Sequence, residues 1–457
     1  MLPDNLRKGK VNNLGVEIPL NPSQLEAVRH GKGPLLIVAG AGSGKTRTLT
    51  QRLIYLIKNS VPPQKIVSIT FTNKAANEMR SRVLQSPLPK AAISEPFIGT
   101  FHSFGAKILR KESRLLGRRP NFVIFDNDDS LKIIKRAHKS LNLPERYSPT
   151  KARYEISKIK NNLLDPEEQD EWLTQVFKEY EGELRRQNAF DFDDLIEKVV
   201  QLFHLKPEVL EKYQSRFDYI LIDEYQDINL AQYALVKLLS SRHGNLNVVG
   251  DDEQAIYGFR WSDFTNFLHF ERDWPEAKIV ELGKNYRSTQ NIVAAAAAVI
   301  KNNKFQRPKE LWTENAAGEA VKVIGAESAE EEAGAISSCI LKNRLEETAV
   351  LYRTNAQSRA LEQALSASSI PYEIFGGLKF YERKEIKDLM AGLRYAFNPQ
   401  DEISRERLTK TFRKAPAKEL VENLPVLAEE LSLLELIGFF LKTTSYFEFL
   451  TDKFENA

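Results

Sequence analysis

The stretch LLIVAGAGSGKT, residues 35–46, joins a short apolar run to a glycine-rich loop. The run Leu35–Val38 has the length of a buried parallel strand, and Leu49, Leu53 and Leu56 recur at helical spacing after the loop. The order strand, glycine-rich turn, helix is typical of a phosphate-binding loop. This stretch therefore predicts an α/β fold based on a P-loop parallel sheet with helices on both faces.

The loop is suited to bind a nucleotide. Its glycines allow successive backbone N–H groups to converge on phosphate oxygens, and the dipole of the following helix adds positive charge. Lys45 can reach the outer phosphates, and the Thr46 hydroxyl can ligate Mg²⁺. Ala39 stands where such loops usually begin with glycine. A glycine-rich turn without a ligand is the alternative, but the flanking elements favour nucleotide binding by Ala41, Gly42, Ser43, Gly44, Lys45, Thr46 and Arg47.

Composition sets the limits of the interpretation. A chain of 457 residues predicts two to four domains, and 42% hydrophobic with 28% charged residues is typical of a soluble globular protein. The formal charge of +3 is almost neutral, so nucleic-acid affinity would have to come from local basic faces. A single cysteine, Cys339, suits a reducing compartment. Because no apolar run has the length of a signal peptide or a membrane span, we expect a cytoplasmic protein with no membrane partner.

Two adjacent carboxylates follow one of five further predicted strands, which cover residues 66–71, 97–100, 217–222, 246–250 and 278–282. Asp223 and Glu224 come directly after the strand 217–222. Two carboxylates at the end of an apolar strand are costly to bury unpaired, but beside a nucleotide they have roles. Asp223 would hold Mg²⁺, and Glu224 would orient and deprotonate the attacking water, which predicts hydrolysis.

Four further side chains are candidates for contacts with the nucleotide. The Gln24 amide, just before the loop, could pair with a donor and an acceptor on an adenine edge. Tyr286 could stack on adenine, and Gln254 could sense the terminal phosphate. Arg287 is a candidate to stabilise the charge of the transition state.

Aromatic residues also follow the strand ends. Phe71 ends one predicted strand, and Tyr257, Phe259 and Trp261 come soon after another. Aromatic rings at the edge of a parallel sheet can stack on the bases of a nucleic acid. Phe101 follows the predicted strand 97–100 in the same way, and ordinary core packing is an equally weighted alternative for both Phe71 and Phe101.

Residues 109–189 are predicted to form a helical insertion with a basic face. Residues 107–160 contain 15 Lys and Arg against 6 Asp and Glu, a local charge of +9, and show no strand alternation. Contact with nucleic acid and a merely solvated helix face are equally weighted interpretations of this charge.

The ordered set of motifs resembles the superfamily 1 DNA helicases of the UvrD/Rep/PcrA type. The resemblance covers residues 20 to about 398 and rests on ten motifs: Gln24, AGAGSGKT (39–46), TFTNKAA (70–76), TFHSF (100–104), DFDDL (191–195), IDEYQD (222–227), GDDEQAIYGFR (250–260), NYRS (285–288), YRTNAQSR (352–359) and GGLKFYERKEIKD (376–388).

The resemblance implies a translocase that moves 3′ to 5′ on single-stranded DNA and hydrolyses ATP, with Mg²⁺, between two RecA-like lobes. Gln24 and Tyr286 would hold adenine; Lys45, Thr46, Asp223 and Glu224 would carry the metal and phosphate chemistry; Gln254 and Arg287 would contact the terminal phosphate. Single-stranded DNA and single/double-strand junctions would be the partners. The DNA would be contacted by Phe71, Asn73, His102, Phe192, Tyr257, Phe259 and Arg359, while Arg260 would touch phosphate or DNA.

One motif departs from the family pattern. Phe259 stands where relatives commonly have tryptophan, and Trp261 stands where they commonly have glycine. Phenylalanine offers less stacking area than tryptophan, so we expect a weaker grip on a base at position 259.

The domain organisation follows from the motifs and the resemblance. A first RecA-like lobe is expected at 20–108 and 190–285, after an N-terminal arm at 1–19. A partial second lobe is expected at 286–384, with strands at 321–324, 349–352 and 372–375, and a second helical insertion is expected from 385 to 457.

Two motifs that the resemblance implies for the second lobe, including a second arginine finger, are not found before Ala457. Loss of a transition-state arginine costs several kcal/mol. We therefore expect this chain to bind ATP and DNA with impaired turnover. A non-unwinding, DNA-binding regulator that uses ATP as a switch is the alternative.

Overall fold

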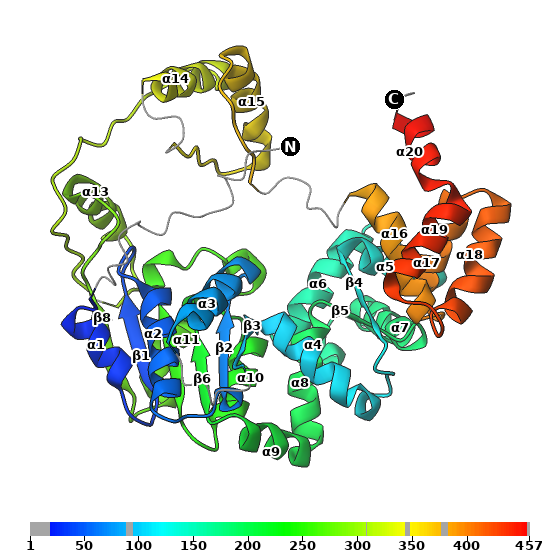
Figure 1. Cartoon of the computed structure of the whole chain (residues 1–457), viewed down its shortest axis with the longest axis horizontal. Helices are drawn as coiled ribbons and strands as arrows, with labels where there is room; N and C mark the ends of the chain where they lie inside the picture. The colour runs from blue at the N-terminus through cyan, green and yellow to red at the C-terminus, as the bar shows by residue number, and fades with distance from the viewer. Residues whose placement is uncertain (1–18, 88–94, 308, 343–347, 376–382, 455–457) are drawn as a thin grey trace.

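The computed structural model describes residues 19–87, 95–307, 309–342, 348–375 and 383–454 (Figure 1). Residues 1–18 of the predicted N-terminal arm and residues 376–382 of the last family motif lie outside the described residues.

A six-stranded parallel sheet forms the centre of the first lobe. Its strand order is β3-β2-β6-β7-β1-β8, and every recorded pairing is parallel. The predicted strands are confirmed within one or two residues at their ends. They are β1 (Leu35–Ala39), β2 (Ile66–Thr70), β3 (Phe97–Thr100), β6 (Tyr219–Ile222), β7 (Leu246–Gly250) and β8 (Lys278–Leu282).

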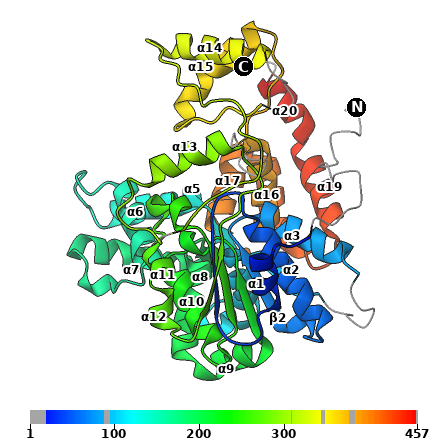
Figure 2. The same ribbon diagram turned by 90° about the vertical axis from the view of Figure 1, so that its left-hand side faces the viewer.

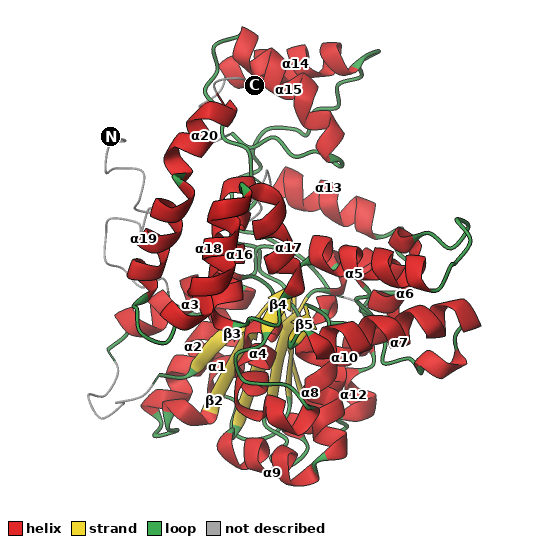
Figure 3. Ribbon diagram, turned by 90° about the vertical axis from the view of Figure 1, so that its right-hand side faces the viewer, coloured by secondary structure: helices red, strands yellow, loops and turns green. Residues whose placement is uncertain are grey.

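Helices cover both faces of this sheet, because successive side chains of its strands point to opposite sides. Leu35 and Ile37 of β1 belong to one buried cluster, and Leu36 and Val38 belong to the other. Figure 3 shows the strands between these two helical layers. One layer contains α1 (Pro22–Arg29), α2 (Lys45–Lys58) and α3 (Asn73–Gln85), and the other contains α4 (Phe101–Glu112), α8 (Asp194–Leu205), α9 (Pro207–Arg216), α10 (Leu230–Ser240), α11 (Thr265–Leu268) and α12 (Phe270–Asp273).

The insertion between α4 and α8 is mainly helical, as predicted. It contains α5 (Asn127–Ser140), α6 (Pro149–Asn161) and α7 (Glu171–Arg186) around a separate apolar cluster. The expectation that its basic part lacks strands is wrong. The short strand β4 (Val123–Phe125) pairs in parallel with β5 (Ala189–Asp191), which lies 66 positions further along the chain when their first residues are compared. A strand of three residues shows too little alternation to be recognised from sequence.

The described part of the second lobe is helical. The sequence also predicts helices at 327–343 and 358–368, between the expected strands. They are present as α14 (Ala329–Leu341) and α15 (Ser358–Ala367), after α13 (Gln290–Ile300). Figures 1 and 2 show α14 and α15 beyond α13, away from the sheet.

The strands expected at 321–324, 349–352 and 372–375 are wrong, since the structure assigns no strand to these described residues. Val323, Leu351 and Phe375 are 95%, 93% and 82% exposed, so their apolar character is not used for packing against a neighbouring strand. A parallel strand forms only where adjacent strands satisfy its backbone groups.

The last helices pack together and against the insertion. They are α16 (Lys384–Phe397), α17 (Glu402–Thr411), α18 (Lys414–Leu427), α19 (Leu433–Thr444) and α20 (Tyr446–Phe454). Arg394 of α16 donates to Asp129 of α5 at 2.8 Å, and Ile403 of α17 joins the apolar cluster of the insertion. Within the described ranges, none of these or the other helices is both long and apolar enough for a bilayer crossing.

Candidate nucleotide site and nucleic-acid surface

The glycine-rich loop lies at the carboxyl end of β1, between β7 and β8, so the segments that follow these three strands meet at one edge. Gly42 and Gly44 have φ values of 68° and 86°, which other residues rarely adopt. A Cβ at Gly42 would come within 2.8 Å of Asn285 Nδ2 and 2.9 Å of Arg287 Cβ. Glycine is therefore required where the loop contacts the segment after β8.

The first two residues of α2 face acidic side chains from other strands. Thr46 Oγ1 donates a hydrogen bond of 2.9 Å to Asp223 Oδ2, beyond the end of β6. Lys45 Nζ lies 3.5 Å from Asp251 Oδ2, beyond the end of β7. This second contact is long for an ion pair, so Asp251 holds Lys45 near the loop only weakly.

The Asp223 carboxylate is buried without a recorded ion pair among the described residues. Burial, and then the charge of Glu224, raise the pKa of Asp223 to about 7. The same two causes raise the pKa of Asp227 to about 7. A buried carboxylate beside a hydroxyl, with excess negative charge around it, is a set of hard oxygen donors that fits Mg²⁺. The residues present therefore fit the predicted metal.

Glu224 follows Asp223 in the left-handed backbone region, with φ of 52°. Its carboxylate accepts a hydrogen bond of 2.9 Å from Gln226 Nε2. The oxygen of the same Gln226 amide accepts from the Asp251 N–H at 3.0 Å, so Gln226 joins the segments after β6 and β7. A strained conformation such as that of Glu224 persists where the surrounding contacts fix it, and it is enriched at functional sites.

A cavity of about 310 Å³ lies over the loop and gathers most of the predicted phosphate residues. It is lined by residues 42–47 together with Glu224, Gln254 and Arg287. Glu78 and Arg82 of α3 also line it, with Arg82 Nη2 lying 2.5 Å from Glu78 Oε1. Sequence reasoning missed these two residues, because an acid and a base four positions apart occur on many exposed helices.

The predicted adenine residues lie beside the loop but outside the lining of that cavity. Gln24 is buried, and its Nε2 donates to the Ser43 carbonyl at 2.9 Å while its Oε1 accepts from the Asn21 N–H at 3.1 Å. Asn21 Nδ2 donates to the Tyr286 hydroxyl at 2.9 Å. The amide of Gln24 thus joins a helix cap to the loop, and its adenine contact stays a prediction.

The predicted nucleic-acid residues of the first lobe form two neighbouring aromatic groups. The ring centroids of Phe71 and Tyr257 are 4.8 Å apart, and those of Tyr257 and Phe259 are 5.9 Å apart. His102 and Phe192 form the second pair at 5.5 Å. Phe259 and Phe192 are 66% and 52% exposed, so large apolar faces remain available to a ligand.

Arg260 links the two groups. Its guanidinium lies 5.5 Å from the centre of the Tyr257 ring and 5.6 Å from that of Phe259. Burial, and then the charge of Arg260, lower the pKa of His102 to about 4, so His102 is neutral at physiological pH. Asn73 is the first residue of α3, directly after the turn that carries Phe71. An arginine among exposed rings is the combination that recognises single-stranded nucleic acid.

Comparison with known proteins identifies the family. Residues 20–275 match the UvrD/REP helicase N-terminal domain, and residues 280–457 match the UvrD-like helicase C-terminal domain. The chain belongs to the UvrD/Rep helicase family.

Relatives are similar over most of this chain. "ATP-dependent DNA helicase PcrA" from Staphylococcus epidermidis is 45% identical over 424 residues, which cover 90% of this chain and 58% of the relative. The protein of the same name from Bacillus subtilis is 45% identical over 421 residues, covering 89% and 57%. That from Staphylococcus aureus is 43% identical over 436 residues, covering 92% and 60%. This UvrD/Rep-family chain thus spans a little over half the length of these relatives.

The C-terminal family domain contributes a lysine to the nucleotide edge that sequence reasoning missed. Lys309 Nζ lies 2.6 Å from Asp251 Oδ1 and 2.7 Å from Asp252 Oδ1, and its side chain is 3% exposed. The backbone N–H of Arg307 also donates to Asp252, at 2.7 Å. Asp251 therefore accepts contacts from Lys45, Gln254 and Lys309 at once. A lone lysine among polar residues gives no signal of a partner 58 positions away.

Arg359, the remaining predicted DNA residue, is not brought to this surface. It lies on α15, which Figure 1 shows beside α14 and apart from the sheet.

Proposed function

We propose that this chain is the ATP-hydrolysing and DNA-binding part of a helicase that moves 3′ to 5′ along single-stranded DNA. The observation that carries the proposal is the shared sheet edge. The segment after β7 supplies Gln254 to the phosphate cavity and, three residues later, Tyr257 to the exposed aromatic surface. A change at the terminal phosphate would therefore be transmitted to the DNA surface through a very short piece of backbone.

The residues of the cavity divide the chemistry between them. Lys45 would leave its long contact with Asp251 and bind the outer phosphates, as the lysine of such loops does. Thr46 and Asp223 would hold Mg²⁺, which when bound supplies positive charge to the phosphate oxygens. Glu224 would orient and deprotonate the attacking water, while Gln254 and Arg287 would stabilise charge on the terminal phosphate.

The aromatic surface would hold DNA by stacking. Each stacked base contributes about 1 to 3 kcal/mol and requires no particular sequence, as a motor that moves along DNA needs. Single/double-strand junctions are the proposed site of action. We also propose a cytoplasmic location. The similar proteins come from bacteria, whose DNA lies in the cytoplasm.

We also propose that this chain turns over ATP poorly by itself. In the described residues the second lobe contributes helices without a sheet, and Arg359 lies apart from the other predicted DNA residues. Arg287 brings charge from the start of the second lobe to the phosphate cavity, but among the described residues no other arginine of that lobe lines it, so the transition state would be stabilised incompletely.

The test is steady-state ATP hydrolysis with and without single-stranded DNA, alongside binding of both ligands. We expect ATP and DNA to bind, hydrolysis to be slow, and Glu224→Gln to abolish what remains without loss of ATP affinity. A fast, DNA-stimulated rate would overturn the proposal of poor turnover. Failure of ATP or DNA to bind would overturn the helicase proposal itself.

The switch alternative requires a separate readout. If Glu224→Gln kept the biological effect of the protein, a DNA-binding switch would replace the motor. Direction of movement is measured by displacement of streptavidin from biotin at either DNA end; displacement from the 3′ end would contradict the proposed polarity, because a 3′ to 5′ motor clears the 5′ end.

A further inference from the structure

Trp261 has a backbone conformation that its residue type does not favour. Its φ is 66°, in the left-handed region where a bulky side chain is an outlier. Glycine is the residue that adopts such a conformation at no steric cost. The chain therefore carries a strained tryptophan where glycine would be easier, and such strain is enriched at sites of function.

The surrounding backbone fixes this conformation. The Trp261 N–H donates to the Gly258 carbonyl at 3.1 Å, and Ser262 forms an antiparallel bridge with Asn229. Asn229 Nδ2 in turn donates to Asn161 Oδ1 at 2.6 Å, at the end of α6. The turn is thus attached both to the first lobe and to the helical insertion.

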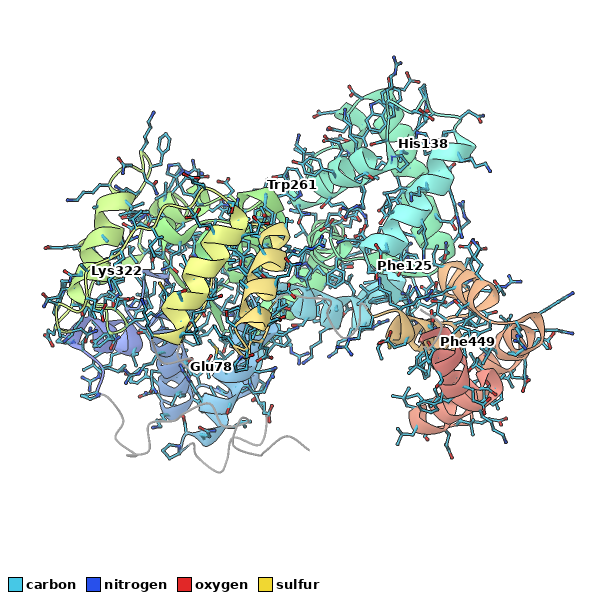
Figure 4. The ribbon with its side chains drawn as sticks, turned by 90° about the horizontal axis from the view of Figure 1, so that it is seen from above. Glu78, Phe125, His138, Trp261, Lys322 and Phe449 are labelled. Carbon is cyan, nitrogen blue, oxygen red and sulfur yellow. The ribbon has the colours of Figure 1, made fainter. Side chains whose placement is uncertain are left out.

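The Trp261 ring lies against Tyr154 of α6. Their ring centroids are 4.6 Å apart with an interplanar angle of 55°, and Tyr154 is 52% exposed. Figure 4 shows Trp261 at the boundary between the first lobe and the insertion. Because the rings are tilted and Tyr154 is half exposed, the pair keeps aromatic area available at this boundary.

The pair continues the aromatic surface already described. Trp261 directly follows Arg260, whose guanidinium lies over Tyr257 and Phe259. Half-buried and exposed rings therefore extend from Phe71 through the segment after β7 to α6, with a permanent positive charge among them. A positively charged, sequence-independent row of rings matches the chemistry of single-stranded nucleic acid.

We propose that Trp261 and Tyr154 form an additional stacking site for a base of single-stranded DNA, where the first lobe meets the insertion. This site would add stacking area beside the exposed ring of Phe259. The inference rests on the proposed function, because it assigns further residues to the same DNA surface. A packing contact that only holds the insertion in place is the competing explanation, and the two differ in their effect on DNA affinity.

The experiment measures binding of fluorescein-labelled oligothymidylate to the whole chain by anisotropy. We expect Tyr154→Ala and Trp261→Gly each to weaken binding about tenfold, as expected for one lost stacked base. Trp261→Phe keeps a ring and should retain most of the affinity. Thermal unfolding of Trp261→Gly should not fall, because glycine relieves the strained φ.

A second aromatic pair provides the matched control. Tyr147 and Trp172 stack in the insertion at 4.7 Å, and among the described residues neither ring is paired with an aromatic ring of the segment after β7. Tyr147→Ala should leave oligothymidylate affinity unchanged. Tryptophan emission gives an independent readout, because a base stacked on Trp261 should quench it in the wild-type chain and in Tyr147→Ala but not in Trp261→Phe.

The outcomes separate the inference from the proposed function. If wild type and Tyr147→Ala bind DNA, and Tyr154→Ala and Trp261→Gly bind equally well, the stacking site is wrong and the pair only packs. If Tyr147→Ala weakens binding as much as Tyr154→Ala, the effect is not specific to the site and the inference also fails. If wild type does not bind the oligonucleotide, the proposed function fails first.

Discussion

Two groups of buried acids in this chain differ in whether a nearby lysine neutralises them. At the junction of the insertion with the first lobe, Lys160 Nζ lies 2.7 Å from each of Glu181, Asp191 and Asp194. At the nucleotide edge, Asp223 is equally buried but its recorded side-chain partner is the hydroxyl of Thr46. Lys160 therefore neutralises part of the charge of the first group, whereas Asp223 has no ion pair with a lysine or arginine among the described residues.

Among the acids held by Lys160, the pKa of Glu181 reflects this difference. Although the Glu181 side chain is only 15% exposed and largely desolvated, Lys160 and then Lys198 hold its pKa well below the usual range. Burial and the charge of Asp191 still raise the pKa of Asp194 to about 6, so its close contact with Lys160 does not fully offset desolvation there. At the nucleotide edge the pKa of Asp223 rises to about 7. A permanent cation thus marks a structural cluster, and a missing cation marks a site prepared for a ligand.

The largest expected effect comes from removing the built-in cation. Lys160→Met would leave three buried carboxylates without their shared partner, which should lower the free energy of unfolding by about 3 to 5 kcal/mol. Urea unfolding followed by circular dichroism measures this change. Lys158→Met on the same helix removes only an exposed lysine 3.9 Å from Glu155, and should change stability by less than about 0.5 kcal/mol. Equal effects from the two variants would show that Lys160 is not the centre of the cluster.

The acid without a cation should respond in the opposite direction. Because the pKa of Asp223 is raised in the folded state, the folded chain binds a proton that the unfolded chain releases, and stability is lost as pH rises from about 4 to about 7. Asp223→Asn removes this penalty, so in metal-free buffer it should stabilise the chain by up to about 4 kcal/mol at pH 8 and very little at pH 4.

Thermal unfolding at several pH values measures the difference between Asp223→Asn and wild type. Glu429→Gln, at an exposed acid, serves as the control and should show no such trend. A stabilisation by Asp223→Asn that is the same at pH 4 and pH 8 would contradict the raised pKa.

Asp251 is an intermediate case. It has two lysine partners, the distant Lys45 of the loop and the close Lys309 of the C-terminal family domain. Lys309 balances Asp251 and allows Lys45 to remain 3.5 Å away from it. Without Lys309, Asp251 would attract Lys45 more strongly and compete with the phosphates. We expect Lys309→Met to weaken binding of a fluorescent ATP analogue about tenfold, equivalent to about 1.4 kcal/mol.

Two further variants test this explanation. Adding Asp251→Asn to Lys309→Met should recover much of the lost affinity, because the competing charge is gone. Lys322→Met, at a lysine whose side chain is 75% exposed, should bind like wild type. If the double variant binds no better than Lys309→Met, the lysine acts through the fold and not through Asp251.

How far the sequence predicted the molecule depends on the range of the contacts. The loop at 39–46 and the acids after residue 222 were predictable because each motif is contiguous and lies at a strand end. Lys160 and Lys309 were not, because their partners lie 31 and 58 positions away and isolated lysines carry no local pattern. The second-lobe strands were overpredicted because an apolar run indicates a strand only when neighbouring strands are beside it.

The smallest expected effect concerns the exposed rim of the phosphate cavity. Arg82 and Glu78 line that cavity, but their side chains are 44% and 52% exposed, so solvent screens their charges. An exposed charge of this kind contributes about 0.2 to 1 kcal/mol.

Arg82→Ala should therefore weaken binding of the ATP analogue only about twofold to fivefold, and the loss should shrink as salt rises. Lys58→Ala, at the far end of α2, should have no effect at any salt concentration. A loss of tenfold or more that persists at high salt would mean that Arg82 closes over the bound phosphates and is shielded there, and the rim would then belong with the buried nucleotide edge.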